Sequence, residues 1–408
     1  MPEFVTSIDA VAGFMAKGVH AGLKTNGKRD MTLVVSDRDC AAGAVFTRNL
    51  LKAAPVLVNQ EHLARAADRI RAVAVNTVSA NAGTGEIGLN NSRRMAELTA
   101  GLIGCDSQQV FVMSTGVIGT HLPMHKIQHG LEIAYDGLGD CWQEASEGIM
   151  TTDAHPKIAS IKVTTSQGIC TIGGLTKGAG MIAPNMATML GIIVTDALLN
   201  PEQAQTTLST AAEVSYNRIV VDGDTSTNDM VVLLANGASG VAISNDADLR
   251  QFQEALDELT TYLAQQVVRD GEGATKFVTI DVRGASSNAA ANQIAHTIAA
   301  SPLVKTAFYG NDANWGRIMA AAGRAGIDFD VATTSLCLSP GLQFDSEDAI
   351  LLFDKGMKAS YNEEEATAII SADNVYATLD LGGGDGQAIV WTCDLSHEYV
   401  SINADYRS

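Results

Sequence analysis

The sequence lacks the features of an exported, membrane-spanning or disulfide-stapled protein. Its 408 residues contain no run of about eighteen apolar residues, and its N-terminus lacks the basic and then apolar pattern of a secretory signal. The six cysteines are widely scattered and include no Cys-x-x-Cys pair, which argues against a disulfide framework and against a zinc knuckle. From these absences we expect a cytoplasmic protein without a membrane segment.

Basic residues are also scarce. Acidic residues number 46 and basic residues 27, so the net charge is −19. A surface of this charge repels phosphate backbones, which argues against a nucleic-acid groove. The sequence has neither a Gly-x-x-x-x-Gly-Lys-Ser/Thr phosphate loop nor a Gly-x-Ser-x-Gly elbow. A small anionic substrate would therefore need a local cationic site.

Two arrangements resemble metal sites, but each lacks a required feature. His121, His125 and His129 recur every four residues, but Pro123 is expected to begin the helix and leaves His121 outside it. The acidic loop at residues 222–229 lacks the spacing and the terminal Glu of a calcium-binding EF-hand loop. We predict no metal site, a partly exposed helix face for the histidines, and a hydrogen-bonded bracing loop at 222–229.

Helical and strand patterns alternate along the chain. Apolar residues recur at helical spacing over 61–72, 92–104 and 248–269. Short apolar runs indicate buried strands at 72–76, 110–113 and 192–194. The end of the chain is β-rich, with closing strands expected near 375–382, 387–394 and 397–403. We predict a mixed α/β (α+β) fold of layered sheets flanked by helices, large enough for one or two domains.

A dinucleotide-binding fingerprint is one alternative for the middle of the chain. Gly178, Gly180 and Ala183 have part of the Gly-x-Gly-x-x-Ala spacing, and Asp196 lies downstream. Pro184 interrupts the helix that should open at the second glycine, and no clean β-α-β unit surrounds the motif. These departures disfavour the dinucleotide site.

The same stretch places Thr188 directly after the small residue Ala187, in a segment bent by two glycines and a proline. The Thr188 hydroxyl could attack the carbonyl of the preceding peptide bond, and hydrolysis of the resulting ester would make Thr188 a new chain start. Its free α-amine, with an ordinary pKa of about 7.7 to 8.0, could then serve as the base for its own hydroxyl. From spacing alone, a packing or turn residue remains the commoner interpretation.

The run from Lys177 to Leu190 resembles the self-cleavage site of the ornithine acetyltransferase (glutamate N-acetyltransferase, ArgJ) family, nearly continuously over fourteen positions. The resemblance extends from the region of Ala41 to the C-terminus. It implies a self-cleaving, N-terminal-nucleophile fold of the ornithine acetyltransferase/DmpA-like type. It also implies a cut between Ala187 and Thr188 into an α chain, 1–187, and a β chain, 188–408, with two of each chain in a heterotetramer.

The resemblance implies transfer of acetyl from N-acetyl-L-ornithine to L-glutamate in arginine biosynthesis, by a ping-pong reaction. Thr188 is the implied nucleophile, and Thr115 with Gly116 the implied oxyanion hole. The implied substrate contacts are Thr151, Lys177, Thr188, Glu272, Asn403 and Ser408. An ammonium at Lys177 suits a substrate α-carboxylate. No cofactor is implied, and acetyl-CoA stays open as a co-substrate.

Without the resemblance, Thr115 and Gly116 would be interpreted as a strand-to-helix turn and Glu272 as a solvated turn residue. The chain also departs from the family pattern. Ser408 stands where the family usually has threonine, and residues 76–81 read Asn-Thr-Val-Ser-Ala-Asn instead of Asn-Ser-Gly-Asn-Ala-Asn. The departure at 76–81 bears on the local loop shape and not on the nucleophile. Two other classes remain open: a related self-cleaving amidohydrolase or aminopeptidase, and an uncut, non-enzymatic or dinucleotide-binding protein.

Overall fold

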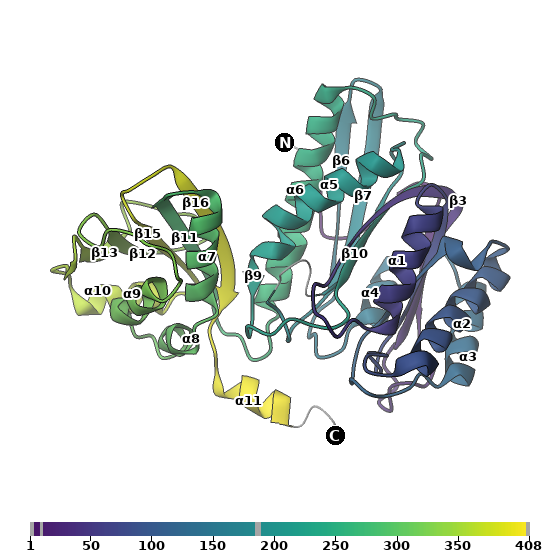
Figure 1. The fold of residues 1–408 in the computed structure, drawn as a ribbon, viewed down its shortest axis with the longest axis horizontal. Coiled ribbons are helices and arrows are strands. Elements are labelled where there is room, and N and C mark those ends of the chain that lie inside the picture. Colours follow the sequence, from purple (N-terminus) through teal and green to yellow (C-terminus); the bar gives the residue numbers. More distant parts are fainter. Residues whose placement is uncertain (1–3, 9–10, 184–188, 405–408) are drawn as a thin grey trace. The chain divides into compact units, whose positions relative to one another are not determined.

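The computed structural model describes residues 4–8, 11–183 and 189–404. Its contacts divide the chain into two units (Figure 1). The first unit comprises Met1–Gly178, Pro184–Asn217 and Thr225–Val267, and the second Ala179–Ala183, Arg218–Asp224 and Val268–Ser408. Each unit contains its own sheet and its own helices. The predicted α/β fold of layered sheets and flanking helices is therefore confirmed.

The described part of the first unit contains a nine-stranded sheet in the order β1-β6-β7-β8-β10-β3-β4-β5, with β2 paired to β3. Its strands are β1 (Phe4–Val5), β2 (Phe14–Val19), β3 (Met31–Phe46), β4 (Ile70–Asn76), β5 (Val110–Ser114), β6 (Lys157–Thr165), β7 (Gly168–Lys177), β8 (Leu190–Thr195) and β10 (Met230–Ala235). Its helices are α1 (Ala54–Ala66), α2 (Gly85–Ile103), α3 (Met124–Asp136), α4 (Trp142–Ile149), α5 (Pro201–Val214) and, up to Val267, α6 (Asp246–Arg269). Its 3₁₀ helices are η1 (Ser107–Gln109) and, up to Asn217, η2 (Tyr216–Arg218).

Alternate residues of the strands in this sheet face two different hydrophobic clusters, as the period of two predicts. Val73 and Val75 of β4 pack in a cluster with α4, whereas Ala72 and Ala74 join a cluster with α2 and α3. In the middle of the sheet, β8 lies between β7 and β10 and is buried along its whole length. The strand predicted at 192–194 is thus one of the best-protected elements of the unit.

The described part of the second unit contains a seven-stranded sheet in the order β14-β13-β12-β15-β11-β16-β9. Its strands are β9 (Ile219–Val220), β11 (Phe277–Ala285), β12 (Ser335–Pro340), β13 (Ile350–Asp354), β14 (Met357–Lys358), β15 (Asn374–Asp380) and β16 (Gly386–Cys393). Its helices are α7 (Asn288–Ala299), α8 (Pro302–Tyr309), α9 (Trp315–Gly323), α10 (Glu363–Ile370) and α11 (His397–Ala404).

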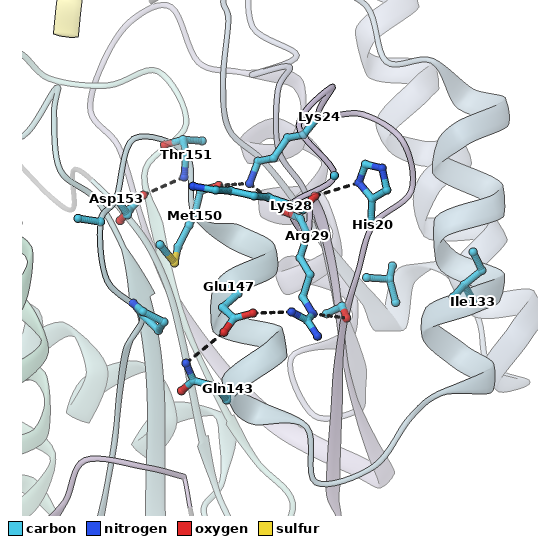
Figure 2. Close-up of a pocket in the computed structure, with 15 residues that line it drawn as sticks. His20, Lys24, Lys28, Arg29, Ile133, Gln143, Glu147, Met150, Thr151 and Asp153 are labelled. Atoms are coloured by element: carbon cyan, nitrogen blue, oxygen red, sulfur yellow. Dashed lines mark hydrogen bonds and ion pairs between the residues drawn. The ribbon is translucent and has the colours of Figure 1, made fainter.

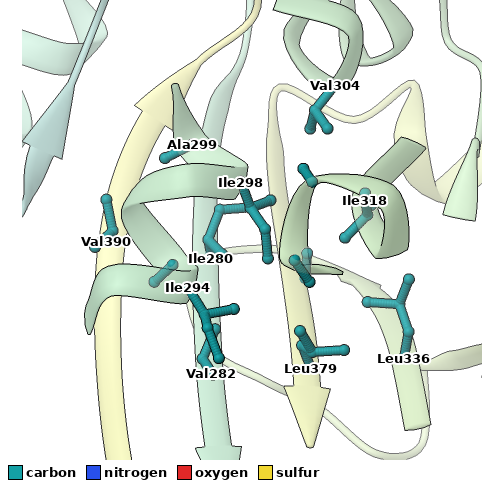
Figure 3. Packing of buried hydrophobic residues seen from close by; sticks show 14 of the residues in the cluster. Ile280, Val282, Ile294, Ile298, Ala299, Val304, Ile318, Leu336, Leu379 and Val390 are labelled. Atoms are coloured by element: carbon teal, nitrogen blue, oxygen red, sulfur yellow. The ribbon is translucent and has the colours of Figure 1, made fainter. Parts of the chain in front are cut away.

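The core of this unit forms where α7 covers the sheet. Ile280 and Val282 of β11 pack with Ile294 and Ile298 of α7, and all four side chains are buried (Figure 3). Leu379 of the neighbouring strand β15 belongs to the same cluster. This core holds β11 and β16, which adjoin the turn that carries Glu272 and the helix α11 that carries Asn403.

Most predicted elements are present, with shifts at their ends. The helix expected at 61–72 is α1, Ala54–Ala66, because Pro55 begins it in the first turn. The helix expected at 248–269 is confirmed as α6, and the histidine helix begins at Met124, directly after Pro123.

The strand expected at 397–403 is wrong, since these residues form the helix α11. Ser396 stands just before this helix, and its Oγ accepts a hydrogen bond from the main-chain N–H of Glu398 at 3.2 Å. A serine in this place is a helix-start signal. Here the helix-start signal prevails over the strand preference of the β-branched residues that follow.

No helix in the described ranges is long and apolar enough to cross a membrane. Within the same ranges, no group of three His, Cys, Asp or Glu side chains converges as metal ligands would. The turn after β7, at residues 178–182, is not helical, unlike the glycine-rich turn of a dinucleotide site.

Candidate active site

The Thr115-Gly116 turn follows the end of β5 and requires glycine. Gly116 has φ +132°, and a Cβ on it would lie 2.2 Å from the carbonyl carbon of Val78. The turn is bound to the loop after β4 by main-chain hydrogen bonds, from Thr115 N to Asn76 O at 3.0 Å and from Val117 N to Val78 O at 2.9 Å. The close contact of two backbones therefore fixes the position of Thr115.

Residues 76–81, where the chain departs from the family pattern, form a closed loop. The Asn76 side chain donates to the carbonyls of Thr77 and Ser79 and accepts a hydrogen bond from Ser114 Oγ at 2.7 Å. Val78 has φ +75°, a conformation that favours glycine. The loop keeps its hydrogen bonds, and a valine takes the strained position that the family usually gives to glycine.

Lys177, the last residue of β7, brings two other predicted residues together. Its Nζ donates to Thr115 Oγ1 at 3.2 Å and to Thr151 Oγ1 at 2.9 Å, and the residue is only 9% exposed. An ammonium between two hydroxyls is suited to a carboxylate. Three residues from distant parts of the sequence thus form one cationic site within the first unit.

Asp153 is a residue of this site that the sequence did not reveal. Its buried carboxylate accepts hydrogen bonds from Lys157 Nζ at 2.8 Å, from Gly178 N at 2.7 Å and from Thr151 N at 2.9 Å. Burial alone would raise the pKa of Asp153, but the ammonium groups of Lys157 and Lys177 and these hydrogen bonds lower it below its ordinary value. An Asp four residues before a strand lysine matches no motif, so only the structure identifies it.

A pocket of 690 Å³ lies against the same segment (Figure 2). Thr151 and Asp153 line it together with Lys24 and Arg29. Lys24 Nζ donates to the main-chain carbonyls of Arg29 at 2.7 Å and Met150 at 2.8 Å, and burial lowers its pKa. Lys24 thus ties the main chain just before Thr151 to the loop before β3.

In the second unit the structure brings together Glu272 and Asn403. Asn403 Nδ2 donates to Glu272 Oε2 at 2.7 Å, and Glu272 is 8% exposed. The main-chain N–H of Glu272 donates to Ala179 O at 2.8 Å. A Cβ on Gly180 would lie 2.5 Å from the Glu272 carboxylate, so the glycine makes room for it. Glu272 is therefore a buried, held carboxylate and not a solvated turn residue.

The acidic loop at 222–229 is hydrogen-bonded, as predicted. In the second unit, Asp222 accepts from the main-chain N–H groups of Met181 at 2.5 Å and Ile182 at 2.8 Å, and from the Tyr399 hydroxyl at 3.2 Å. In the first unit, the Asn228 side chain donates to the main-chain carbonyls of Ala80, in the loop after β4, and Ser114, the last residue of β5. Both side chains hold main-chain segments that lead to predicted site residues.

The predicted nucleophile Thr188, its cleavage partner Ala187 and the C-terminal Ser408 lie outside the described residues. The chain is described again from Met189, whose carbonyl accepts from Met230 N at 3.0 Å, and β8 begins at the next residue. The segment that follows the proposed cut is thus held between β7 and β10.

Comparisons with known proteins agree with the motif. A family model described as the ArgJ family matches residues 15–408. The arginine biosynthesis bifunctional protein ArgJ of Chlorobaculum tepidum is 45% identical over 397 residues, covering 97% of this chain and 96% of the relative. The mitochondrial protein of that name from Schizosaccharomyces japonicus is 44% identical over 407 residues, covering 97% and 93%.

Among solved structures, the crystal structure of arginine biosynthesis bifunctional protein ArgJ from Bacillus halodurans is 39% identical to this chain. The match covers 52% of this chain and 97% of the Bacillus halodurans chain, with a TM-score of 0.48. The family model spans nearly the whole sequence, and the curated relatives match over nearly their full length. The chain belongs to the ArgJ family, as the run from Lys177 to Leu190 predicts.

Proposed function

We propose that this chain is an ornithine acetyltransferase, which transfers acetyl from N-acetyl-L-ornithine to L-glutamate in arginine biosynthesis. The observation that carries the proposal is the contact of Lys177 Nζ with the hydroxyls of both Thr115 and Thr151. It gives an acidic protein a local ammonium for the α-carboxylate that both substrates share. The family membership supplies the reaction, and this site supplies the recognition.

The enzyme first cuts its own chain. The Thr188 hydroxyl attacks the carbonyl carbon of Ala187, and its proton passes to the amide nitrogen as the C–N bond breaks, which leaves an ester. The break of the C–N bond frees the α-amine of Thr188, and water then hydrolyses the ester to give a carboxylate on Ala187 and a free hydroxyl on Thr188. The α chain is then 1–187 and the β chain 188–408, and two of each assemble in the cytoplasm.

Acetyl transfer follows in two half-reactions. The Thr188 amine takes the hydroxyl proton while Oγ attacks the acetyl carbonyl, and the Thr115 and Gly116 turn stabilises the oxyanion. The proton passes to the leaving amine as the amide bond breaks, so ornithine departs and acetyl-threonine remains. The amine of glutamate then attacks this ester, its proton passes through the Thr188 amine to Oγ as the C–Oγ bond breaks, and N-acetylglutamate leaves while the Thr188 hydroxyl is restored. Glu272, held by Asn403, and Ser408 complete the proposed substrate contacts.

The intact mass of the purified protein under denaturing conditions tests the cut. We expect two species, matching 1–187 and 188–408, and a single uncut, inactive species from Thr188→Ala. Thr188→Ser keeps a hydroxyl and serves as the matched control, since it should still cut. A single 42.7 kDa species with full activity would contradict the mechanism.

The activity of the cut enzyme is then measured with N-acetylornithine as donor, with and without glutamate. Acetyl transfer to glutamate supports the proposal, whereas release of free acetate at the same rate would indicate a related self-cleaving amidohydrolase. Relatives are named bifunctional. Acetyl-CoA is therefore offered as a second donor in the same assay, because N-acetylglutamate formed from it would show a second activity.

A further inference from the structure

Asp153 joins two segments of the first unit, residues 151–157 and the end of β7, through one carboxylate. Its Oδ1 accepts from Lys157 Nζ at 2.8 Å and Gly178 N at 2.7 Å, and its Oδ2 accepts from Thr151 N at 2.9 Å. The side chains of Asp153 and Lys157 are 0% and 2% exposed. Such a fully hydrogen-bonded, buried charge pair holds its surroundings in a single arrangement.

Two of the three groups that Asp153 holds belong to the cationic site. Thr151 supplies the hydroxyl that accepts from Lys177 Nζ, and Gly178 directly follows Lys177 in the chain. The carboxylate therefore fixes the backbone at both ends of the Thr151–Lys177 hydrogen bond. Lys157, the first residue of β6, donates to the same carboxylate oxygen as Gly178 and supplies the countercharge that stabilises the buried carboxylate.

We propose that Asp153 is a positioning residue of the acyl-transfer site, which holds Thr151 and Lys177 in the geometry that receives the α-carboxylate of the amino-acid substrates. The inference rests on the proposed function. A purely structural alternative is that Asp153 only neutralises Lys157 inside the unit. The two roles predict different results once both charges are removed together.

The experiment uses the full-length chain in four forms: wild type, Asp153→Asn, Lys157→Met, and the double variant. Asn keeps the shape of Asp but presents N–H groups to the donors, while Met keeps the length of Lys without its charge. For each form we measure the fraction of cut chain by mass, the thermal midpoint, and kcat and KM for N-acetylornithine and glutamate. The value of kcat is divided by the cut fraction.

We expect each single variant to unfold at a lower temperature, because it leaves a buried charge without its partner. The double variant should recover most of this loss. Its KM for both substrates should nevertheless stay roughly ten- to hundredfold above wild type, the range of a lost hydrogen bond to a charged group. Lys157→Met alone leaves the carboxylate on Thr151 and Gly178, so its KM should remain near that of wild type.

A double variant with wild-type KM values would overturn the positioning role, whatever the effect on stability. If the double variant fails to fold, Asp153→Asn and Lys157→Met are compared below their unfolding temperatures, and equal KM values in these two would also overturn it. Absence of acetyl transfer by the wild-type chain would instead overturn the proposed function, and this inference with it.

Discussion

Replacement of Gly116 by alanine tests how the oxyanion turn is built. A Cβ at this position would lie 2.2 and 2.3 Å from the carbonyl carbon and oxygen of Val78, and both atoms belong to the backbone. The overlap cannot be relieved by a side-chain rotation. The two loops must separate, and the hydrogen bond from Val117 N to Val78 O at 2.9 Å is stretched or lost.

The expected loss of stability has two sources, and the loss of rate has a third. Alanine at φ +132° stores about 1–3 kcal/mol of backbone strain, and one lost main-chain hydrogen bond adds about 1 kcal/mol. A shift of Thr115 by about 1 Å would slow the reaction about a hundredfold, close to the 10²–10³-fold effect of deleting an oxyanion donor. Gly116→Ala should therefore lose about 2–4 kcal/mol of folding stability, and its kcat should fall about a hundredfold.

Gly119→Ala is the matched control in the same loop. Gly119 also has a positive φ, +84°, but a Cβ on it would meet no atom within 4 Å. Gly119→Ala should lower the free energy of unfolding by about 1–2 kcal/mol through backbone strain alone and leave kcat near that of wild type. The measurements are urea unfolding and acetyl transfer per cut chain. A Gly116→Ala enzyme with the stability and kcat of wild type would refute the reasoning.

Two further substitutions test glycine-dependent geometry elsewhere. Val78→Gly should stabilise the protein by about 1 kcal/mol, because it relieves about 1–2 kcal/mol of backbone strain at φ +75°. This gain outweighs the cost of the greater conformational freedom that glycine gives the unfolded chain. A lower free energy of unfolding in urea would contradict this. Gly180→Ala should push the Glu272 carboxylate away from Asn403 and so raise the KM for N-acetylornithine. The thermal midpoint should stay nearly unchanged, since the flexible Glu272 side chain can move. An unchanged KM would argue against Glu272 as a substrate contact.

The sequence predicted elements with strong periodicity and missed those decided by single residues. The helix at 248–269 and the buried strand at 192–194 are present because long amphipathic or fully apolar segments have few alternatives. At the C-terminus, Ser396 begins a helix where the apolar pattern indicated a strand. One hydrogen bond at the helix start is a weak signal against the two β-branched residues Val400 and Ile402, so the prediction failed there.

The site was predicted unevenly for a related reason. Residues proposed to face the ligand, such as Lys177 and Glu272, lie in motifs that resemble the family, and the structure brings each of them to a predicted partner within its own unit. Asp153 has no signature, because its partner in the cationic site, Gly178 N, is a backbone group distant in sequence. Asp222 lies in the loop expected to be hydrogen-bonded, but the sequence did not indicate that its partners are the main-chain N–H groups of Met181 and Ile182. Pattern reasoning sees side-chain chemistry but not tertiary hydrogen bonds.

Residues that face the ligand and residues that hold the main chain behind them should respond differently to substitution in the first unit. Asn228 and Asp153 are buried, and their side chains bond to main-chain groups of the segments that carry Thr115 and Thr151, respectively. The buried side chain of Asn76 holds the loop at 76–81, whose backbone bonds to the Thr115 turn. Removing such a side chain leaves buried backbone groups unsatisfied, which costs stability as well as geometry. A residue that faces the ligand has fewer internal partners to lose, so its replacement should reduce activity with less effect on folding. A loss of activity without a loss of stability therefore distinguishes the contact residues from the supports behind them.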